Sequence, residues 1–255
     1  MNTISMAPPR WTVRGTPRPG APRLYCFPHG GGSAAEYVRI AREVPGVEVH
    51  AIQLPGRGTR LREDAFSRMS DLVERLVEEV EFGAEPFAFF GHCFGTLVAY
   101  EVTRELRRTG RRLPERLVLS GYPAAHIPRL EPSMLGFGDE ELIAEVGRRY
   151  GWEPDGVVDD PELRALAAGS LRSDFEVLET YRWQPEAPLP MPVTVFGGRA
   201  DAVTKEALTA WREHTTQDVT VRMLPGGHFY FREPRSPLPR FLAGATRGLS
   251  VAQAA

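Results

Sequence analysis

Short apolar runs alternate along this chain with segments in which apolar residues recur every three or four positions. The runs have the length of buried strands, and the recurrences indicate amphipathic helices. Strands are predicted at 23–27, 47–53, 87–90, 116–120, 191–196 and 219–224. Helices are predicted at 70–82, 94–108, 139–150, 161–181 and 236–248. This alternation favours an α/β fold with a mostly parallel sheet and helices on both faces.

The segment from 124 to 190 interrupts this alternation, because it contains two helical patterns and little strand signal. Its length favours a helical lid inserted above the strand ends, where it would cover an active site. An ordinary pair of packed crossover helices is the alternative. The remaining organisation is predicted as a flexible arm rich in Pro, Arg and Gly (1–22), a single domain (23–245) and a short tail (246–255).

Composition narrows the range of partners. The chain has 255 residues, a formal net charge of −2 and two cysteines. Near-neutral charge argues against nucleic acid as the main partner. No window approaches the roughly 18 apolar residues of a membrane span, and no apolar leader opens the chain. We therefore expect a monomer without membrane association, located in the cytoplasm with its cysteines reduced. The dispersed histidines and unpaired cysteines predict no metal site.

The strongest chemical signal is the turn Gly91-His92-Cys93-Phe94-Gly95, which lies between a predicted buried strand and a helix. It has the form of the G-x-S-x-G nucleophile elbow, with Cys in the place of Ser. The crowded turn needs glycines on both sides, and the helix N-terminus favours a negative charge. Cys93 is therefore the candidate nucleophile, whereas Cys26 is read as a packing residue.

Two further residues follow in the chain order that this template requires. His228 comes just after the last predicted strand and is the candidate base, although a loop histidine can also serve as a cap or a surface residue. Asp201 follows the strand at 191–196 and would orient His228. The alternatives are that Asp201 only caps a helix beginning near Thr204, and that Asp218 is the acid instead.

An oxyanion hole is built from backbone N–H groups and leaves little side-chain signal. One donor is expected from Phe94, the residue directly after the nucleophile. The second is expected from the loop His29-Gly30-Gly31-Gly32 after the first predicted strand, with Gly30 and Gly31 as candidates. A merely flexible glycine turn is the alternative.

Five motifs together give the chain a resemblance, over about residues 23–245, to type II thioesterases of polyketide and nonribosomal peptide assembly lines. They are Phe27-Pro28-His29-Gly30-Gly31-Gly32-Ser33-Ala34, Gln53-Leu54-Pro55-Gly56-Arg57-Gly58, the elbow with Ala99-Tyr100-Glu101, Leu171-Arg172-Ser173-Asp174-Phe175, and Gly226-Gly227-His228-Phe229. The chain departs from the family pattern at Gly30, where Ala is usual, and at Cys93, where Ser is usual.

The resemblance implies an α/β-hydrolase fold with a helical lid and the hydrolysis of acyl groups from carrier-protein phosphopantetheine arms. It implies no cofactor of the enzyme's own, and it implies a carrier protein docked by its acidic helix against arginines near the lid. Met134, Leu135, Phe137 and Phe175 are candidates to shape the acyl pocket, by position alone. They would suit a short to medium acyl chain, and they would equally suit simple lid packing.

Cysteine leaves the second half of the reaction open. A Cys93 acyl-enzyme retains a thioester, so either water or another acceptor could take the acyl group. The leading prediction is a thioesterase, and the alternative is an acyltransferase that shuttles acyl or aminoacyl groups between carriers. Two other interpretations are an engineered replacement of Ser by Cys93 and a carrier-binding chaperone without chemistry. Retention of Cys93, Asp201 and His228 together argues against the chaperone.

Overall fold

A computed structural model describes residues 11–83, 85–129, 131–151, 160–233 and 235–249. These residues form a seven-stranded sheet with the order β1-β3-β2-β4-β5-β6-β7. β1 is antiparallel to β3, and the other neighbouring strands are parallel. The strands are β1 (Thr12–Arg14), β2 (Arg23–Phe27), β3 (Glu48–Ile52), β4 (Phe87–His92), β5 (Arg116–Ser120), β6 (Val193–Gly198) and β7 (Val219–Leu224).

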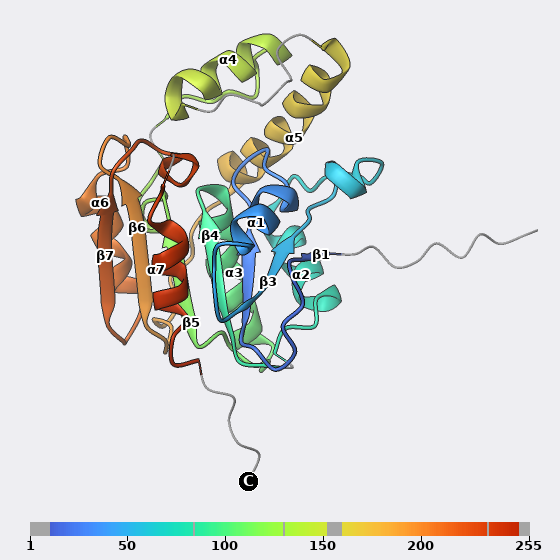
Figure 1. The fold of residues 1–255 in the computed structure, drawn as a ribbon. Helices are drawn as coiled ribbons and strands as arrows, with labels where there is room; N and C mark the ends of the chain where they lie inside the picture. The colour runs from blue at the N-terminus through green and yellow to red at the C-terminus, as the bar shows by residue number, and fades with distance from the viewer. Residues whose placement is uncertain (1–10, 84, 130, 152–159, 234, 250–255) are drawn as a thin grey trace, which may run out of the picture.

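Helices cover both faces of the sheet (Figure 1). One core lies under α1 and α7, and the other lies under α2, α3 and α6. The helices are α1 (Ala34–Ala41), α2 (Met69–Glu79), α3 (Phe94–Arg108), α4 (Asp139–Tyr150), α5 (Pro161–Thr180), α6 (Lys205–Thr209) and α7 (Leu238–Ala245). The predicted α/β architecture with a mostly parallel sheet is confirmed.

The position of the central strand β4 between two cores explains why its sequence is one unbroken apolar run. Phe87 and Phe89 point into one core, whereas Ala88 and Phe90 point into the other, and all four are fully buried. Side chains alternate between the two faces of a strand, and helices cover both faces here. The strand therefore has no solvent side that would require polar residues.

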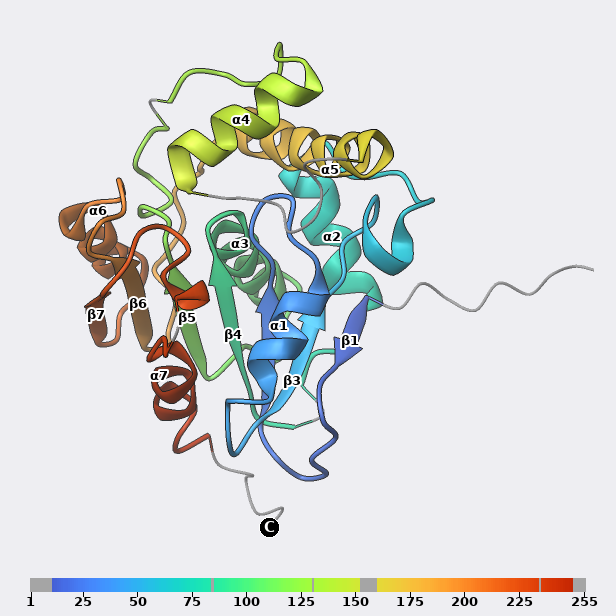
Figure 2. The ribbon, with the colours of Figure 1, turned by 45° about the horizontal axis from the view of Figure 1, so that its top comes forward.

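Residues 124–190, called the lid below, contain α4 and α5. Both helices lie beyond the end of the sheet at which β4 passes into α3 (Figures 1 and 2). Val146 and Tyr150 of α4, and Leu171 and Phe175 of α5, line a cavity that also contains Cys93. The insertion therefore covers the elbow rather than packing on a face of the sheet.

Two elements were not expected from the sequence. The segment 1–22 was predicted to be a flexible arm, but Thr12–Arg14 forms β1 on the edge of the sheet. The pattern also gave no signal for α1, which follows the glycine loop. In the predicted tail, Thr246 and Leu249 are buried, so the described part of that segment packs on the domain.

Among the described residues, no helix has the length and apolar character needed to cross a membrane.

Trp11 explains why the residues around β1 are ordered. Its side chain is 4% exposed, and its indole N–H donates to Oε2 of Glu79 at 2.6 Å. The Arg60 guanidinium lies 3.9 Å from the centre of its ring. We therefore expect Trp11→Ala to lower the free energy of unfolding by about 3–5 kcal/mol, as measured in urea. Leu61→Ala, at an exposed position, is the control and should cost less than about 1 kcal/mol. Equal costs would contradict an anchoring role for Trp11.

Candidate active site

The turn between β4 and α3 holds Cys93 in a strained conformation, with φ 52° and ψ −120°. A positive φ is unfavourable for a residue with a Cβ and persists only where the surroundings enforce it. Here the Cys93 N–H donates to the Ser120 carbonyl at 2.8 Å, and the Thr96 hydroxyl donates to the carbonyls of Gly91 and Ser120 at 2.8 Å. The turn is thereby tied to the neighbouring strand β5.

Gly91 and Gly95 leave no room for a side chain. A Cβ on Gly91 would lie 2.2 Å from the carbonyl oxygen of Gly95, and a Cβ on Gly95 would lie 2.1 Å from that of Phe27. Both neighbours are backbone atoms, which cannot move aside cheaply. The close approach of three backbone segments thus explains the G-x-C-x-G spacing.

The structure brings Asp201 and His228 together from the loops after β6 and β7. Oδ2 of Asp201 lies 2.9 Å from Nδ1 of His228, and each side chain is 3% exposed. The helix cap that was considered for Asp201 is provided by Thr204 instead, which accepts from the Ala207 N–H. Because Nδ1 is engaged by Asp201, Nε2 is the nitrogen that remains for Cys93.

The electrostatics of His228 favour a charged imidazolium. Burial disfavours the charge, but the Cys93 thiolate and the Asp201 carboxylate outweigh it and raise the pKa of His228 to about 10. By contrast, burial alone raises the pKa of the Cys26 thiol, which lies in the core. Among the described residues, a base and a charge partner therefore lie near Cys93 but not near Cys26.

His92, within the elbow, is not a competing base. It is fully buried, with its ring centre 4.9 Å from that of His228, and its Nδ1 lies 2.8 Å from the Ser120 hydroxyl. Burial and the nearby positive charge of His228 keep the pKa of His92 well below its usual range. His92 therefore packs beneath His228 as a neutral ring.

Cys93 and His228 open into a cavity of about 290 Å³ beneath the lid. Its wall is largely apolar, with side chains from both lid helices. Phe175 lines this cavity, as expected, but Met134 and Phe137 do not. Met134 is fully buried in the core and Phe137 packs against that core. Composition predicts apolar lid residues but not the direction in which each one points, so these two belong to lid packing.

The oxyanion candidates differ in what their N–H groups contact. Phe94 is the first residue of α3, where the backbone N–H has no partner within the helix. The Gly31 N–H donates to Oδ2 of Asp174 at 2.8 Å and is therefore occupied. Gly30 lines the cavity, and its N–H has no hydrogen bond in the part of the chain that the structure describes. Of the two glycines, Gly30 is the one with an available donor.

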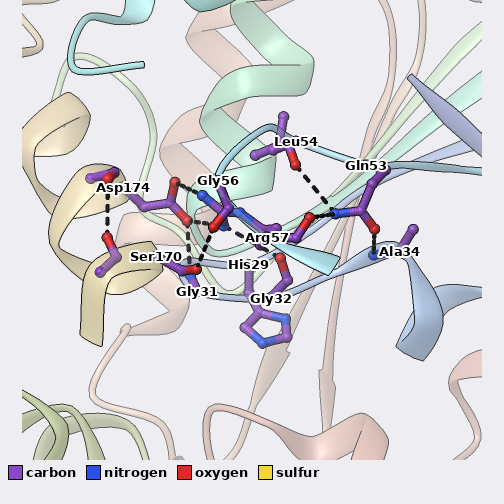
Figure 3. A network of polar contacts seen from close by, with 12 residues as sticks. His29, Gly31, Gly32, Ala34, Gln53, Leu54, Gly56, Arg57, Ser170 and Asp174 are labelled. Carbon is purple, nitrogen blue, oxygen red and sulfur yellow. Dashed lines mark hydrogen bonds and ion pairs between the residues drawn. The ribbon is translucent and has the colours of Figure 1, made fainter. Parts of the chain in front are cut away.

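A buried ion pair fixes the glycine loop to the lid (Figure 3). The Arg57 guanidinium donates to Oδ2 and Oδ1 of Asp174 at 2.5 and 2.7 Å, and the two side chains are 5% and 4% exposed. Arg57 also donates to the Gly32 carbonyl at 3.4 Å. Asp174 thus binds both Arg57 and Gly31 and joins α5 to two loops at the sheet edge.

Two supporting residues complete this network. The Ser170 hydroxyl, one helical turn before Asp174, donates to the Gly56 carbonyl at 3.2 Å. Gln53 accepts from the Ala34 N–H and donates to the carbonyls of Leu54 and Arg57 (Figure 3). The sequence motifs contain Gln53, Arg57 and Asp174, but sequence reasoning assigned them no role. The available signal was an aspartate on the apolar face of α5, which requires a buried partner.

Comparison with known proteins agrees with this geometry. Residues 22–243 match the family model described as a thioesterase domain. The chain belongs to the thioesterase family. It is 35% identical over 228 residues to the gramicidin S biosynthesis protein GrsT of Aneurinibacillus migulanus, covering 88% of this chain and 89% of that protein. It is 36% identical to the thioesterase PikA5 of Streptomyces venezuelae, covering 88% and 80%.

A solved structure extends the agreement to three dimensions. The type II thioesterase BorB from the borrelidin biosynthetic cluster superposes with a TM-score of 0.82 and 34% identity, covering 93% of this chain and 98% of that one. The predicted α/β-hydrolase fold is therefore confirmed for this thioesterase. The match to the thioesterase family also shows that the protein is an enzyme that hydrolyses thioesters.

The pKa of His228 gives a direct test of its pairing with Cys93. Cys93→Ser removes the ionisable thiol group, the main favourable partner of the imidazolium, so the pKa of His228 should fall from about 10. Stability from this group is fully present below the unfolded pKa of roughly 6.5 and is lost as pH rises through about 10. NMR titration of the imidazole, assigned with His228→Gln, measures the change. An unchanged pKa would show that Cys93 does not interact with His228.

Asp174→Asn tests the ion pair that holds the glycine loop. It leaves Arg57 charged and buried without its partner, which typically costs about 3–5 kcal/mol in the free energy of unfolding. We also expect lower turnover, because the Gly31 N–H loses a charged acceptor. Asp139→Asn is the matched control in the lid, since Asp139 pairs with Arg172 at a half-exposed site and should cost less than about 1 kcal/mol. Similar losses in the two variants would contradict this role for Asp174.

Proposed function

We propose that the protein hydrolyses acyl thioesters carried on the phosphopantetheine arms of carrier proteins in polyketide or nonribosomal peptide biosynthesis. The observation that carries this proposal is the contact between Asp201 and His228 beside Cys93, at the floor of an apolar cavity beneath the lid. The biosynthetic assignments of GrsT and BorB support the pathway class. The phosphopantetheine arm enters as part of the substrate.

The first half of the reaction forms an acyl-enzyme. The Cys93 thiolate attacks the thioester carbonyl, and the negative charge on the carbonyl oxygen is stabilised by the N–H groups of Phe94 and Gly30. The tetrahedral intermediate collapses as the carbon–sulfur bond to pantetheine breaks. His228 gives its proton to the departing thiolate, and Asp201 keeps the imidazole in the tautomer that this transfer needs. The acyl group is then held as a thioester on Cys93.

The second half releases the acyl group. Neutral His228 takes a proton from water, and the resulting hydroxide attacks the acyl carbonyl. The bond to Cys93 breaks and leaves a free acid, while the cysteine thiolate and the imidazolium are restored. In this cycle, His228 acts alternately as acid and base, and its position between Cys93 and Asp201 suits both roles.

The cysteine itself favours a second candidate function. An acyl group moved from pantetheine to Cys93 passes between two thioesters of similar energy, so the step is reversible. A second carrier thiol could then accept the group in place of water. Acyl transfer between carriers is therefore the alternative, and it would use the same Cys93 intermediate.

A carrier loaded with a labelled acyl group distinguishes the two functions. It is incubated with the enzyme, with and without an empty second carrier. Hydrolysis predicts free acid at the same rate in both reactions, whereas label that moves to the second carrier with little free acid would refute the hydrolase proposal. Cys93→Ala should abolish both products, and full activity in this variant would refute both functions.

Cys93→Ser is the informative companion variant. An oxygen ester lies well below a thioester in energy, so the serine variant should be unable to return the acyl group to a thiol. If the enzyme is a hydrolase, Cys93→Ser should retain free acid as its product. If the enzyme is a transferase, the variant should lose transfer, and intact-mass measurement should detect either a stalled acyl-enzyme or free acid.

A further inference from the structure

Arg129 lies on the lid segment between β5 and α4 and lines the same cavity as Cys93. Its Nε donates to Oε2 of Glu131 at 3.0 Å, and one terminal nitrogen lies 3.0 Å from the same oxygen. The guanidinium carbon lies 5.2 Å from the centre of the Phe175 ring. The lid thus brings a charged, planar donor into a largely apolar wall.

The other terminal nitrogen of Arg129 is the unusual feature. It is shielded from solvent and has no hydrogen-bond partner among the described residues, and the terminal nitrogen beside Glu131 makes only the ion-pair contact. A buried donor on a charged group that remains unpaired is costly, and native structures seldom tolerate it without a reason. The neighbouring acids do not satisfy it, because Glu131 is engaged by Nε and by the Tyr150 hydroxyl, and Asp174 is engaged by Arg57 and Gly31.

Arg129 also lies near the reacting sulfur. Burial disfavours its charge, but Tyr150, Glu131 and the Cys93 thiolate together raise the pKa of Arg129 above its ordinary value. An acyl group attached to Cys93 would extend into the cavity whose wall includes Arg129 and Phe175. An oxygen acceptor on the acyl chain would therefore lie beside the side chain that carries the unpaired donor.

We propose that Arg129 selects acyl chains that carry an uncharged oxygen acceptor, such as a hydroxyl or oxo group, over saturated chains of the same length. This inference rests on the proposed function and specifies its substrate class. The charge of Arg129 is already balanced by Glu131, so a neutral oxygen satisfies the free N–H without adding net charge to an apolar cavity. A carboxylate on the chain would bring an uncompensated negative charge, which is expensive to bury.

The test compares butanoyl and 3-hydroxybutanoyl pantetheine thioesters, which differ by one oxygen. The rate of Cys93 acylation is followed by intact mass, and the free acid is followed by chromatography. Acylation is the first step of both hydrolysis and transfer, so the comparison of the two substrates is valid for either function. A hydrogen bond to a charged donor should favour the hydroxylated chain by roughly tenfold or more in kcat/KM. Arg129→Met should bring this ratio close to one. Arg148→Met, at an exposed position on α4, is the matched control and should keep the wild-type ratio.

Several outcomes would overturn the proposal. A wild-type ratio near one would do so, as would an Arg129→Met variant that loses activity on both substrates while keeping the ratio, since that is the behaviour of a packing residue. A succinyl thioester that outperforms 3-hydroxybutanoyl would show that Arg129 reads a carboxylate instead.

A binding measurement separates this inference from the proposed function. Butanoyl and 3-hydroxybutanoyl amides of pantetheine cannot acylate Cys93, so their Kd values report recognition alone. If no thioester acylates the enzyme but the hydroxylated amide binds more tightly and Arg129→Met abolishes the difference, the proposed function fails and the inference holds. Equal Kd values would refute the inference even if hydrolysis is observed.

Discussion

The buried ion pair between Arg57 and Asp174 fixes the position of the lid relative to the loops at the end of the sheet. It joins residues 117 positions apart in the chain, one in the loop after β3 and the other in the lid helix α5. Neither charge could remain in this environment without the other, because removing a single ion from water costs several kcal/mol. The closed arrangement of α5 over the sheet is therefore the arrangement in which both charges are satisfied.

The same carboxylate also fixes the backbone of the loop that lines the cavity together with Cys93. Asp174 accepts from the Gly31 N–H, and Gly31 adopts a positive φ of 70°. Its Cβ, if present, would lie 2.7 Å from a methyl group of Leu171, one turn earlier on α5. The lid helix and the glycine loop are thus in direct contact at Gly31. The neighbouring residue Gly30 lines the cavity.

Sequence reasoning succeeded where local pattern determines structure. Apolar runs predicted strands such as β2 and β5 with the observed bounds, because each is buried on both faces. The order of Cys93, Asp201 and His228 along the chain also predicts that they lie at one edge of the sheet, where parallel strands end, and all three line one cavity. These inferences needed only the periodicity of side chains and the direction of neighbouring strands.

The same reasoning failed where partners lie far apart or where side-chain direction matters. Nothing in the segment around Thr12 shows that β3 leaves an edge available for pairing. The motif around Asp174 shows an acid among apolar residues but does not identify Arg57 as its partner. Its apolar character and its place in the lid favour Met134 as a pocket residue, yet its side chain is fully buried in the core. Each error concerns a tertiary contact for which the sequence carries no periodic signal.

Three positively charged side chains around the cavity each lie beside a negatively charged partner. Arg57 is balanced by Asp174, Arg129 by Glu131, and the His228 imidazolium by Asp201 and the Cys93 thiolate. In the proposed mechanism, acylation of Cys93 removes the negative charge on sulfur, which lowers the pKa of His228 when a proton must reach the leaving thiolate. The imidazole left behind is neutral and ready to accept a proton from the next nucleophile. The proposed acid and base steps would therefore both follow from one change of charge on sulfur, whichever acceptor then takes the acyl group.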